Sequence, residues 1–349
     1  MQEFDLERFE YFLPEGLISQ HPQKERSSSR LMVLDRNTGA TAHCFFPDVL
    51  RFLRPGDCLV LNDSKVFPAR LHGRKETGGQ VECLLLHYPD EIAPGTSRAQ
   101  ALLRSSKPFR PGMRIVCGED LFVTVRCLLG DGKAEVELTH TGPLSSALDR
   151  CGVVPLPPYI RRTPEAADRD RYQTVYASHT GSVAAPTAGL HFTKELLEAI
   201  GKAQVSIVRV TLHVGLGTFA PIRCRDVREH HIHAEWIRVP QETAETIAET
   251  RSRGGRVVAV GTTSVRAIEA AATEDGRVRP VEGTCTLYIV PGFRFRVVDA
   301  MVTNFHLPAS SLLVLVCAFA GRERILAAYD EAIREGYRFY SYGDAMLIM

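Results

Sequence analysis

The fold of this chain is decided by one stretch, RVVAVGTTSVRAIEAAA, residues Arg256–Ala272. Its first half is a short run of valine and alanine, which predicts a buried strand that ends at Gly261. Its second half, from Thr262 onward, has the residue types and spacing of a helix. A strand that passes directly into a helix is typical of a parallel sheet with helices on its faces. We therefore predict an α/β fold.

The same alternation continues on both sides of that stretch. Strands are predicted over 57–61 and 205–217, and helices over 193–203, 241–254 and 322–336. Strands and helices that alternate in this way indicate a three-layer core with a largely parallel sheet.

A segment of different texture interrupts this core. Residues 66–150 contain short β-type runs broken by turns, which favour a small barrel or a sandwich. The proline-rich run 151–162 then leads back to the strand–helix rhythm. We expect residues 1–65 and 151–349 to form the core, and residues 66–150 to form an inserted β-barrel.

Composition excludes several classes of protein. The formal net charge is +1, so the chain as a whole does not attract nucleic acid, and any site for a polyanion is local. The nine cysteines contain no C-x-x-C pair, which argues against a disulfide framework or a cysteine zinc site. The most apolar run, SLLVLVCAFAG, is a buried strand or helix and is too short to cross a bilayer. Without a secretory start, a cytoplasmic location is expected.

Hydroxyl side chains follow the strand of the first stretch. Thr262, Thr263 and Ser264 stand where a strand ends and a helix begins, a place where ligands gather in α/β sheets. They can bind a ribose, a carboxylate or a phosphate there. Capping of the helix by Thr263 or Ser264 explains them equally well.

Two further stretches have the same design. In VTLHVGLGTFAPIR a predicted strand presents His213, two glycines, Thr218 and Phe219. In GSVAAPTAGLHFT, Pro186 and small residues form a slim turn that presents Thr187 and His191 at the start of a helix. A binding site and a simple tight loop both explain such turns.

Three shorter motifs add polar groups. HHIHAEW contains His233 and Glu235, which we predict to share a strand face as an acid/base couple. No third ligand stands at metal-site spacing, so no metal is expected. TNFHLPASS places Asn304 and His306 in a turn, and FYSYGDAM supplies Tyr340 and Asp344 around a glycine.

Nine long runs of unusual composition connect these motifs across the chain: NDSKVFPARLHGRK, PLPPYIRR, RYQTVYA, GSVAAPTAGLHFT, VTLHVGLGTFAPIR, HIHAEW, VAVGTTSVRAIEAAA, PGFRFRVVDAMVTNFHLPASSLLVLVCAFAG and YRFYSYGDAMLI. With them the chain resembles the S-adenosylmethionine:tRNA ribosyltransferase-isomerases of queuosine biosynthesis. It departs at Ala234, where that family usually has serine, and at Ala309, where a charged residue is frequent.

The resemblance implies an α/β core with an inserted barrel. It also implies a reaction in which S-adenosylmethionine donates its ribosyl group to the 7-aminomethyl-7-deazaguanine base at the tRNA wobble position. The products are epoxyqueuosine in tRNA, methionine and adenine. S-adenosylmethionine is then a co-substrate, and tRNA is the partner.

This chemistry requires a base for the C5′ proton beside the sulfonium and a group that assists the departure of adenine. Our hypothesis gives the base to His191 or His213. The predicted catalytic residues are His191, His213, His233, Glu235, His306 and Asp344. The predicted substrate-binding residues are Asn62, Asp63, Thr187, Thr218, Phe219, Thr262, Thr263, Ser264, Arg266, Asn304 and Tyr340. The sulfonium suits an aromatic face, from Phe192, Phe219 or a tyrosine.

Basic residues of the inserted segment and its connector provide the local site for a polyanion. On charge alone a solvated surface explains them better, but a tRNA partner reverses that preference. The predicted tRNA-binding residues are Lys65, Arg70, Arg74, Lys75, Lys107, Arg161 and Arg162. The alternatives are a tRNA methyltransferase that uses S-adenosylmethionine, a nucleoside hydrolase and a non-enzymatic RNA-binding protein.

Overall fold

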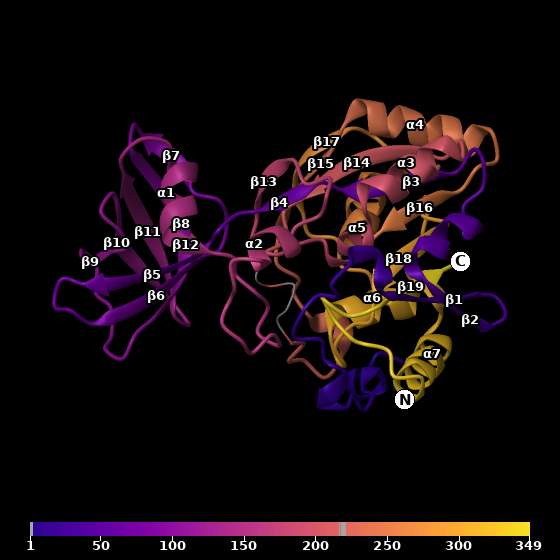
Figure 1. Ribbon diagram of the computed structural model, residues 1–349, viewed down its shortest axis with the longest axis horizontal. Coiled ribbons are helices and arrows are strands. Elements are labelled where there is room, and N and C mark those ends of the chain that lie inside the picture. The colour runs from indigo at the N-terminus through magenta and orange to yellow at the C-terminus, as the bar shows by residue number, and fades with distance from the viewer. Residues whose placement is uncertain (1–2, 216, 218–220) are drawn as a thin grey trace.

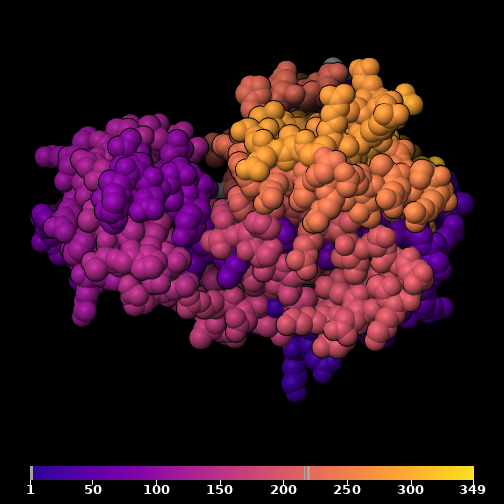
Figure 2. Space-filling model, turned by 90° about the horizontal axis from the view of Figure 1, so that it is seen from above, coloured from indigo at the N-terminus to yellow at the C-terminus, as the bar shows by residue number. Residues whose placement is uncertain are grey.

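The structure is a computed structural model, and it describes residues 3–215, 217 and 221–349. Figure 1 shows two lobes: an α/β core, which holds both ends of the chain, and a β-barrel beside it. In the space-filling view the barrel stands out from the core as a separate body (Figure 2).

Nine strands form the sheet of the core. In spatial order they are β17 (Val281–Cys285), β15 (Glu235–Val239), β14 (Ser206–Leu212), β3 (Cys58–Asn62), β16 (Val257–Val260), β18 (Ala300–Asn304), β19 (Ala345–Ile348), β1 (Arg30–Leu34) and β2 (Thr41–Phe45). The central four, β14, β3, β16 and β18, run parallel, whereas both edges contain antiparallel pairs. The largely parallel sheet is confirmed, with its parallel part at the centre.

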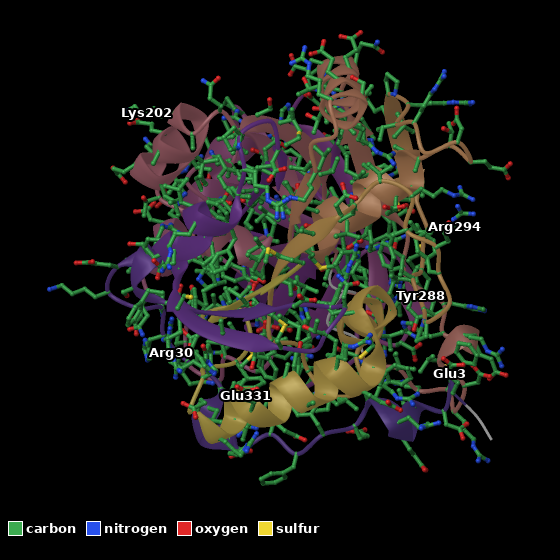
Figure 3. All side chains as sticks on the ribbon, turned by 90° about the vertical axis from the view of Figure 1, so that its right-hand side faces the viewer. Glu3, Arg30, Lys202, Tyr288, Arg294 and Glu331 are labelled. Atoms are coloured by element: carbon green, nitrogen blue, oxygen red, sulfur yellow. The ribbon has the colours of Figure 1, made fainter. Side chains whose placement is uncertain are left out.

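Alternate residues of the strands face two separate hydrophobic layers. In β3, Cys58 and Val60 face one layer, and Leu59 and Leu61 face the other. The first layer is covered by helices, in chain order α4 (Gln241–Ser252), α5 (Thr262–Ala271), α6 (Ser311–Ala320) and α7 (Arg322–Arg334). The second is covered by α3 (Lys194–Lys202) with the 3₁₀ segments Phe46–Phe52 and Thr187–His191. Figure 3 shows Lys202 of α3 and Glu331 of α7 on opposite sides of the sheet, so the core has three layers.

The barrel closes on itself through six antiparallel strands. In chain order they are β5 (Arg70–Lys75), β6 (Gln80–Leu85), β8 (Thr96–Arg104), β9 (Arg114–Val116), β10 (Leu121–Gly130) and β11 (Lys133–His140). Closure is made by the pairing of β11 with β8, so the barrel alternative is confirmed over the sandwich. Three further elements flank it: β7 (Asp90–Ala93), α1 (Leu144–Cys151) and β12 (Gly152–Val153).

Two short strands join the lobes. β4 (Ser64–Val66) leaves the core just before the barrel, and it pairs in parallel with β13 (His179–Ser182), which follows the barrel in the chain. The short helix α2 (Asp168–Arg171) lies between barrel and β13 in the sequence. The connections to the barrel therefore start and end at the same place on the core (Figure 1).

Hydroxyl side chains cap two of the helices, whereas a third helix starts without the cap that the sequence predicted. Thr193 accepts the Leu196 N–H at the start of α3, and Ser310 accepts the Leu313 N–H at the start of α6. The predicted cap of α5 by Thr263 or Ser264 is wrong. Gly261, at φ +86°, precedes the helix without any side-chain cap, because only glycine adopts this turn readily.

Two further observations concern the cysteines and the length of the helices. All nine cysteines are free. Among the residues described, no helix combines the length and the apolar character needed to cross a membrane.

Candidate functional site

Two adjoining cavities lie at the carboxyl ends of β16 and β18. The larger has a volume of about 140 Å³ and the smaller about 30 Å³. They share four lining residues, Thr187, Asn304, His306 and Leu312, so we call them together the chamber. Tyr340 also lines the larger cavity, and Thr262 and Thr263 line the smaller. Ligand sites at the carboxyl ends of parallel strands are the rule in α/β sheets.

The loop that presents Thr187 and His191 is slim because its backbone is closely packed. A Cβ atom on Gly189 would lie 2.0 Å from the hydroxyl oxygen of Tyr176, so only glycine fits there. Pro186 precedes the 3₁₀ segment, and Ala188 within the segment is buried. The loop thus brings His191 against the end of β18.

Asn304, the last residue of β18, connects the parts of the chamber. Its carboxamide oxygen accepts the Thr187 hydroxyl at 3.0 Å. Its Nδ2 donates to His191 Nε2 at 3.1 Å and to the carbonyl groups of Tyr340 and Asp344 at 3.3 and 3.4 Å. The side chain is therefore fully engaged, and it fixes three separate segments of the chain around one point.

Both ring nitrogens of His191 are occupied. Because the Asn304 amide group is a donor, Nε2 accepts, and Nδ1 donates to Ser29 Oγ at 2.8 Å. Burial, with the charges of Arg338 and Arg26, lowers the pKa of His191 to about 3. The ring is consequently neutral at physiological pH.

His306 has a different arrangement. Its Nε2 is 2.7 Å from Thr303 Oγ1, and its backbone N–H donates to the Tyr329 hydroxyl at 3.0 Å, while Tyr11 donates to its carbonyl oxygen. Within the described ranges its Nδ1 has no hydrogen-bond partner, and the ring lines both cavities. Burial lowers the pKa of His306 to about 3, so this imidazole is also neutral.

The start of α5 forms one wall of the smaller cavity. Ser264 is engaged within the helix, where its hydroxyl donates to the Val260 carbonyl at 2.7 Å. Thr263 Oγ1 is buried and has no partner among the described residues, and Thr262 lines the same wall. A helix start with unsatisfied N–H groups and a free hydroxyl suits an anionic or hydroxylated ligand.

Glu235 and Arg266 form a buried ion pair beside the end of β14. Arg266 Nη1 contacts Glu235 Oε2, and its Nε donates to the Leu287 carbonyl at 3.0 Å. The other oxygen of Glu235 accepts the Gly215 N–H at 3.0 Å. The predicted couple of Glu235 with His233 stays a prediction, and the His233 ring packs on Gly217, where a Cβ would be only 2.0 Å away.

His213 belongs to a second polar cluster, which lies between β3, β14 and β13. Its Nδ1 is 2.8 Å from Ser64 Oγ, and its ring stacks on Trp236 with 4.9 Å between centroids. Burial lowers the pKa of His213 to about 4. The neighbouring Asp63 accepts from Thr211 and His179, and Asn62 binds the backbone of Leu212 and Ser64. His213, Asp63 and Asn62 line neither cavity of the chamber.

Two aromatic rings line the chamber, from Tyr340, which the sequence predicted, and from Tyr159, which it did not. Phe192 does not reach it, because it is fully buried against Phe46 on the second layer. Tyr159 and Tyr340 line the larger cavity with 4.6 Å between their ring centroids. Tyr340 holds a left-handed φ of +71°, unusual for this residue type. Thr218 and Phe219 lie outside the described residues.

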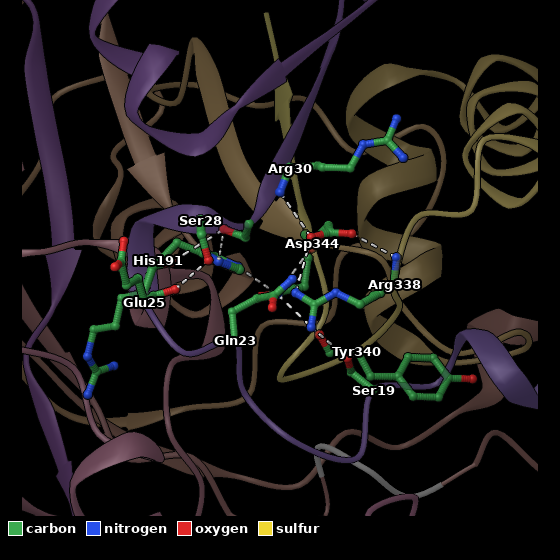
Figure 4. Close-up of polar contacts among 12 residues, drawn as sticks. Ser19, Gln23, Glu25, Ser28, Arg30, His191, Arg338, Tyr340 and Asp344 are labelled. Carbon is green, nitrogen blue, oxygen red and sulfur yellow. Dashed lines mark hydrogen bonds and ion pairs between the residues drawn. The ribbon is translucent and has the colours of Figure 1, made fainter.

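Asp344 is buried behind His191 and does not line the chamber. It accepts the backbone N–H groups of Arg30 and Arg338 at 3.0 and 2.8 Å, and the Arg338 guanidinium approaches to 3.3 Å (Figure 4). A carboxylate in this setting positions the chain and compensates a cation.

The predicted tRNA-binding residues divide by exposure. Lys65, Arg74, Lys107 and Arg161 are exposed, although Arg161 contacts Glu15 at 3.2 Å. Arg70, by contrast, pairs with Glu82 at 3.1 Å, and Arg162 holds Asp168 through two short bonds. Lys75 is buried, because its ammonium group donates to the carbonyls of Lys107 and Pro108, and it therefore anchors a loop.

Several residues at the site were not predicted from the sequence: Tyr11, Arg26, Ser29, Tyr159, Arg171, Tyr329 and Arg338. No local signal marks them, because 162 residues separate Ser29 from His191 and 295 separate Tyr11 from His306. In the part of the chain that the structure describes, no three His, Cys, Asp or Glu side chains are grouped so that they could hold a metal ion.

Comparison with known proteins covers nearly the whole chain. The profile of the family described as "Queuosine biosynthesis protein" matches residues 6–348. A protein from Trichlorobacter lovleyi is 50% identical over 344 residues, with 99% of each chain covered. One from Pelobacter propionicus is 52% identical, with 98% of this chain and 99% of the relative covered. Both are named S-adenosylmethionine:tRNA ribosyltransferase-isomerase.

A solved structure is also similar. The crystal structure of an S-adenosylmethionine tRNA ribosyltransferase from Thermotoga maritima is 36% identical, with a TM-score of 0.54. The match covers 98% of this chain and 100% of that one, so core and barrel are both included.

Proposed function

We propose a reaction for this chain from the premise that it belongs to the queuosine biosynthesis protein family. It is a ribosyltransferase and isomerase whose substrates are S-adenosylmethionine and tRNA. In the finer proposal the acceptor is the 7-aminomethyl-7-deazaguanine base at the wobble position. The products are epoxyqueuosine in tRNA, methionine and adenine. The tRNA substrate favours a cytoplasmic location.

The observation that carries this proposal is the chamber at the ends of β16 and β18. It offers a neutral imidazole, a free hydroxyl, a helix start and two aromatic rings within one space. An uncharged imidazole is able to accept a proton, and the aromatic rings suit a sulfonium cation. These groups suit S-adenosylmethionine, which carries a sulfonium cation, a ribose and an acidic C–H bond at C5′.

We assign the general base to His306 and a positioning role to His191. Nδ1 of His306 faces no competing donor among the described residues, whereas both nitrogens of His191 are engaged. The base takes the C5′ proton, and adenine leaves with the electron pair of its glycosidic bond and takes up a proton. The amine of the tRNA base forms a bond to the sugar and gives up a proton. An epoxide closes as the C–S bond breaks and methionine departs.

The start of α5 is the proposed place for the sugar hydroxyls or the carboxylate of the co-substrate. Thr263 Oγ1 and the free N–H groups of the first turn would satisfy such oxygens. The buried Glu235–Arg266 pair lines neither cavity, and Arg266 belongs to the same helix, α5.

One experiment tests the proposal directly. The protein is incubated with S-adenosylmethionine and tRNA that carries the aminomethyl base, and products are identified by mass spectrometry. We expect free adenine, methionine and a heavier nucleoside in the tRNA. S-adenosylhomocysteine in place of adenine would indicate a methyltransferase, and adenine released without tRNA would indicate a hydrolase. Either result contradicts the proposal.

A further inference from the structure

A second hollow opens on the other side of His191 from the chamber. It has a volume of about 20 Å³ and is lined by side chains of three arginines, Arg26, Arg171 and Arg338, together with Ser29 and His191. Figure 4 shows residues around it, with His191 and Glu25 on one side and Arg338 on the other. The mechanism above makes no use of these arginines.

Arg338 pairs with Asp344, whereas the guanidinium groups of Arg26 and Arg171 form no ion pair among the described residues. Arg26 donates to the carbonyls of Leu190 and Asp170 at 3.2 and 2.6 Å. Arg171 donates to the carbonyls of Gln23 and Lys24 at 2.6 and 2.8 Å, and its Nε is buried without a partner. Carbonyl groups orient these cations without neutralising them.

The guanidinium groups of Arg26 and Arg171 repel each other, and the nearby Asp170 offsets only part of this effect on Arg26. The charge of Arg171 adds to burial in lowering the pKa of Arg26, and both Arg26 and Arg338 lower that of His191. Arg338 is compensated by Asp344, and Arg162 nearby is compensated by Asp168. Glu25 also lines the hollow, but its side chain is exposed and forms no ion pair with these arginines within the described residues.

We propose that this hollow binds an oxyanion, a carboxylate or a phosphate group, between Arg26 and Arg171 beside His191. Such a group would cancel the repulsion and accept the unused Nε–H of Arg171. Arginine is suited to this task because its fork of N–H groups matches the oxygens of a carboxylate or phosphate. The hollow is too small for a whole nucleotide, so it takes one charged group of a larger ligand.

The oxyanion has two possible sources, and naming them rests on the proposed function. One is the carboxylate of S-adenosylmethionine, and the other is a backbone phosphate of the tRNA. Binding measurements separate them. We compare Arg171→Gln and Arg26→Gln with Arg324→Gln, a matched control. Arg324 also donates to backbone carbonyls, of Ala320 and Asn37, but lies at the start of α7.

If the carboxylate binds there, both variants weaken S-adenosylmethionine binding by about tenfold and leave binding of its decarboxylated analogue unchanged. If a phosphate binds there, affinity for tRNA falls and its salt slope drops by about 1, with S-adenosylmethionine binding unchanged. Neither change, or an equal change in Arg324→Gln, overturns the proposal.

A measurement on the wild-type protein covers the case in which a variant fails to fold. Phenylglyoxal modifies accessible arginines, and peptide mapping locates the modified positions. We expect inorganic phosphate to protect Arg26 and Arg171 and to leave Arg324 reactive. Equal modification with and without phosphate overturns the proposal. Failure of the proposed function is seen separately, as no adenine release by the wild-type protein with S-adenosylmethionine and tRNA.

Discussion

His191 and Asn304 are joined by a 3.1 Å hydrogen bond, although 113 residues separate them in the sequence. The bond links the slim loop before α3 to the end of β18, and it fixes which ring nitrogen of His191 carries the proton. The hydrogen bond at one ring nitrogen of a histidine determines the orientation of the ring and which nitrogen carries the proton. Hydrogen bonds of Asn304 thus hold together the segments that form the chamber.

Replacement of His306 should remove the base. We expect His306→Ala to lower exchange of the C5′ hydrogen with solvent by about 10²–10⁴-fold, the usual contribution of general-base assistance. Deuterium incorporation into S-adenosylmethionine in the presence of tRNA measures this. His191→Ala and His213→Ala test the bases predicted from the sequence. His43→Ala, on the edge strand β2, is the control, and normal exchange in His306→Ala would assign the base elsewhere.

Loss of the Asn304 carboxamide should cost stability as well as activity. Asn304→Leu leaves the buried carbonyls of Tyr340 and Asp344 without their donor, for which we expect about 1–3 kcal/mol in the free energy of unfolding. Urea unfolding measures it. Thr187→Val removes only the single bond to Asn304 and should cost less. Equal losses in the two variants would show that the carboxamide is not the central connection.

The buried histidines should make stability depend on pH. The pKa of His191 is about 3 in the folded chain and near 6.5 when unfolded, so the unfolded state binds more protons between these values. Stability is therefore complete above pH 6.5 and falls by about 1.4 kcal/mol per pH unit below it. In urea unfolding between pH 5 and 6, the free energy of unfolding of His191→Gln should fall less steeply with decreasing pH, because the contribution of His191 is missing. An identical slope in wild type and variant would mean that the ring is charged when folded.

A methyl group at Gly181 should displace His213. The added Cβ would lie 2.4 Å from His213 Nε2, so the ring must move off Trp236. We expect Gly181→Ala to lower the melting temperature and to change the fluorescence of the single tryptophan. Gly201→Ala is the control. It adds a Cβ with nothing within 4 Å, inside α3, and should stabilise the chain by up to about 1 kcal/mol.

Affinity for tRNA should depend on salt and on the exposed cations of the barrel. Reversal of the charge of Arg70 and Arg74 should weaken binding, with the larger effect at Arg74, since Arg70 is paired with Glu82. Filter binding between 50 and about 200 mM salt measures it. Arg253→Glu, directly after the end of α4, is the control, and Lys75→Met should lower stability while tRNA affinity is kept. Salt-independent affinity would contradict a phosphate-based interface.

The sequence predicts the architecture well because the fold depends on local pattern. The strand of Val257–Val260, the helix after it and the short strands of the barrel all follow from periodicity and turn residues. It also identifies the turn that carries His191, but its placement of Asn304 in a turn is wrong, because Asn304 is the last residue of β18. It does not reveal that these two side chains meet, nor that His213 lies in a different cluster, since both depend on packing between distant segments.

The sequence also does not reveal which charged residues are buried or paired. Lys75 belongs to a basic run in the sequence, yet its ammonium group is buried on carbonyl oxygens. Arg26 stands among serines and glutamate with no distinguishing spacing, yet it lines the hollow beside His191. Exposure and charge compensation are properties of the folded chain, and composition alone does not determine them.

The first strand of the barrel, β5, lies next to β12, the short strand through which the chain leaves the barrel, with Gly152 opposite Leu71 and Val153 opposite Arg70. A body whose two ends meet in this way interrupts no strand of the nine-stranded sheet. A chimaera that carries another relative's barrel on this core needs only two junctions, side by side.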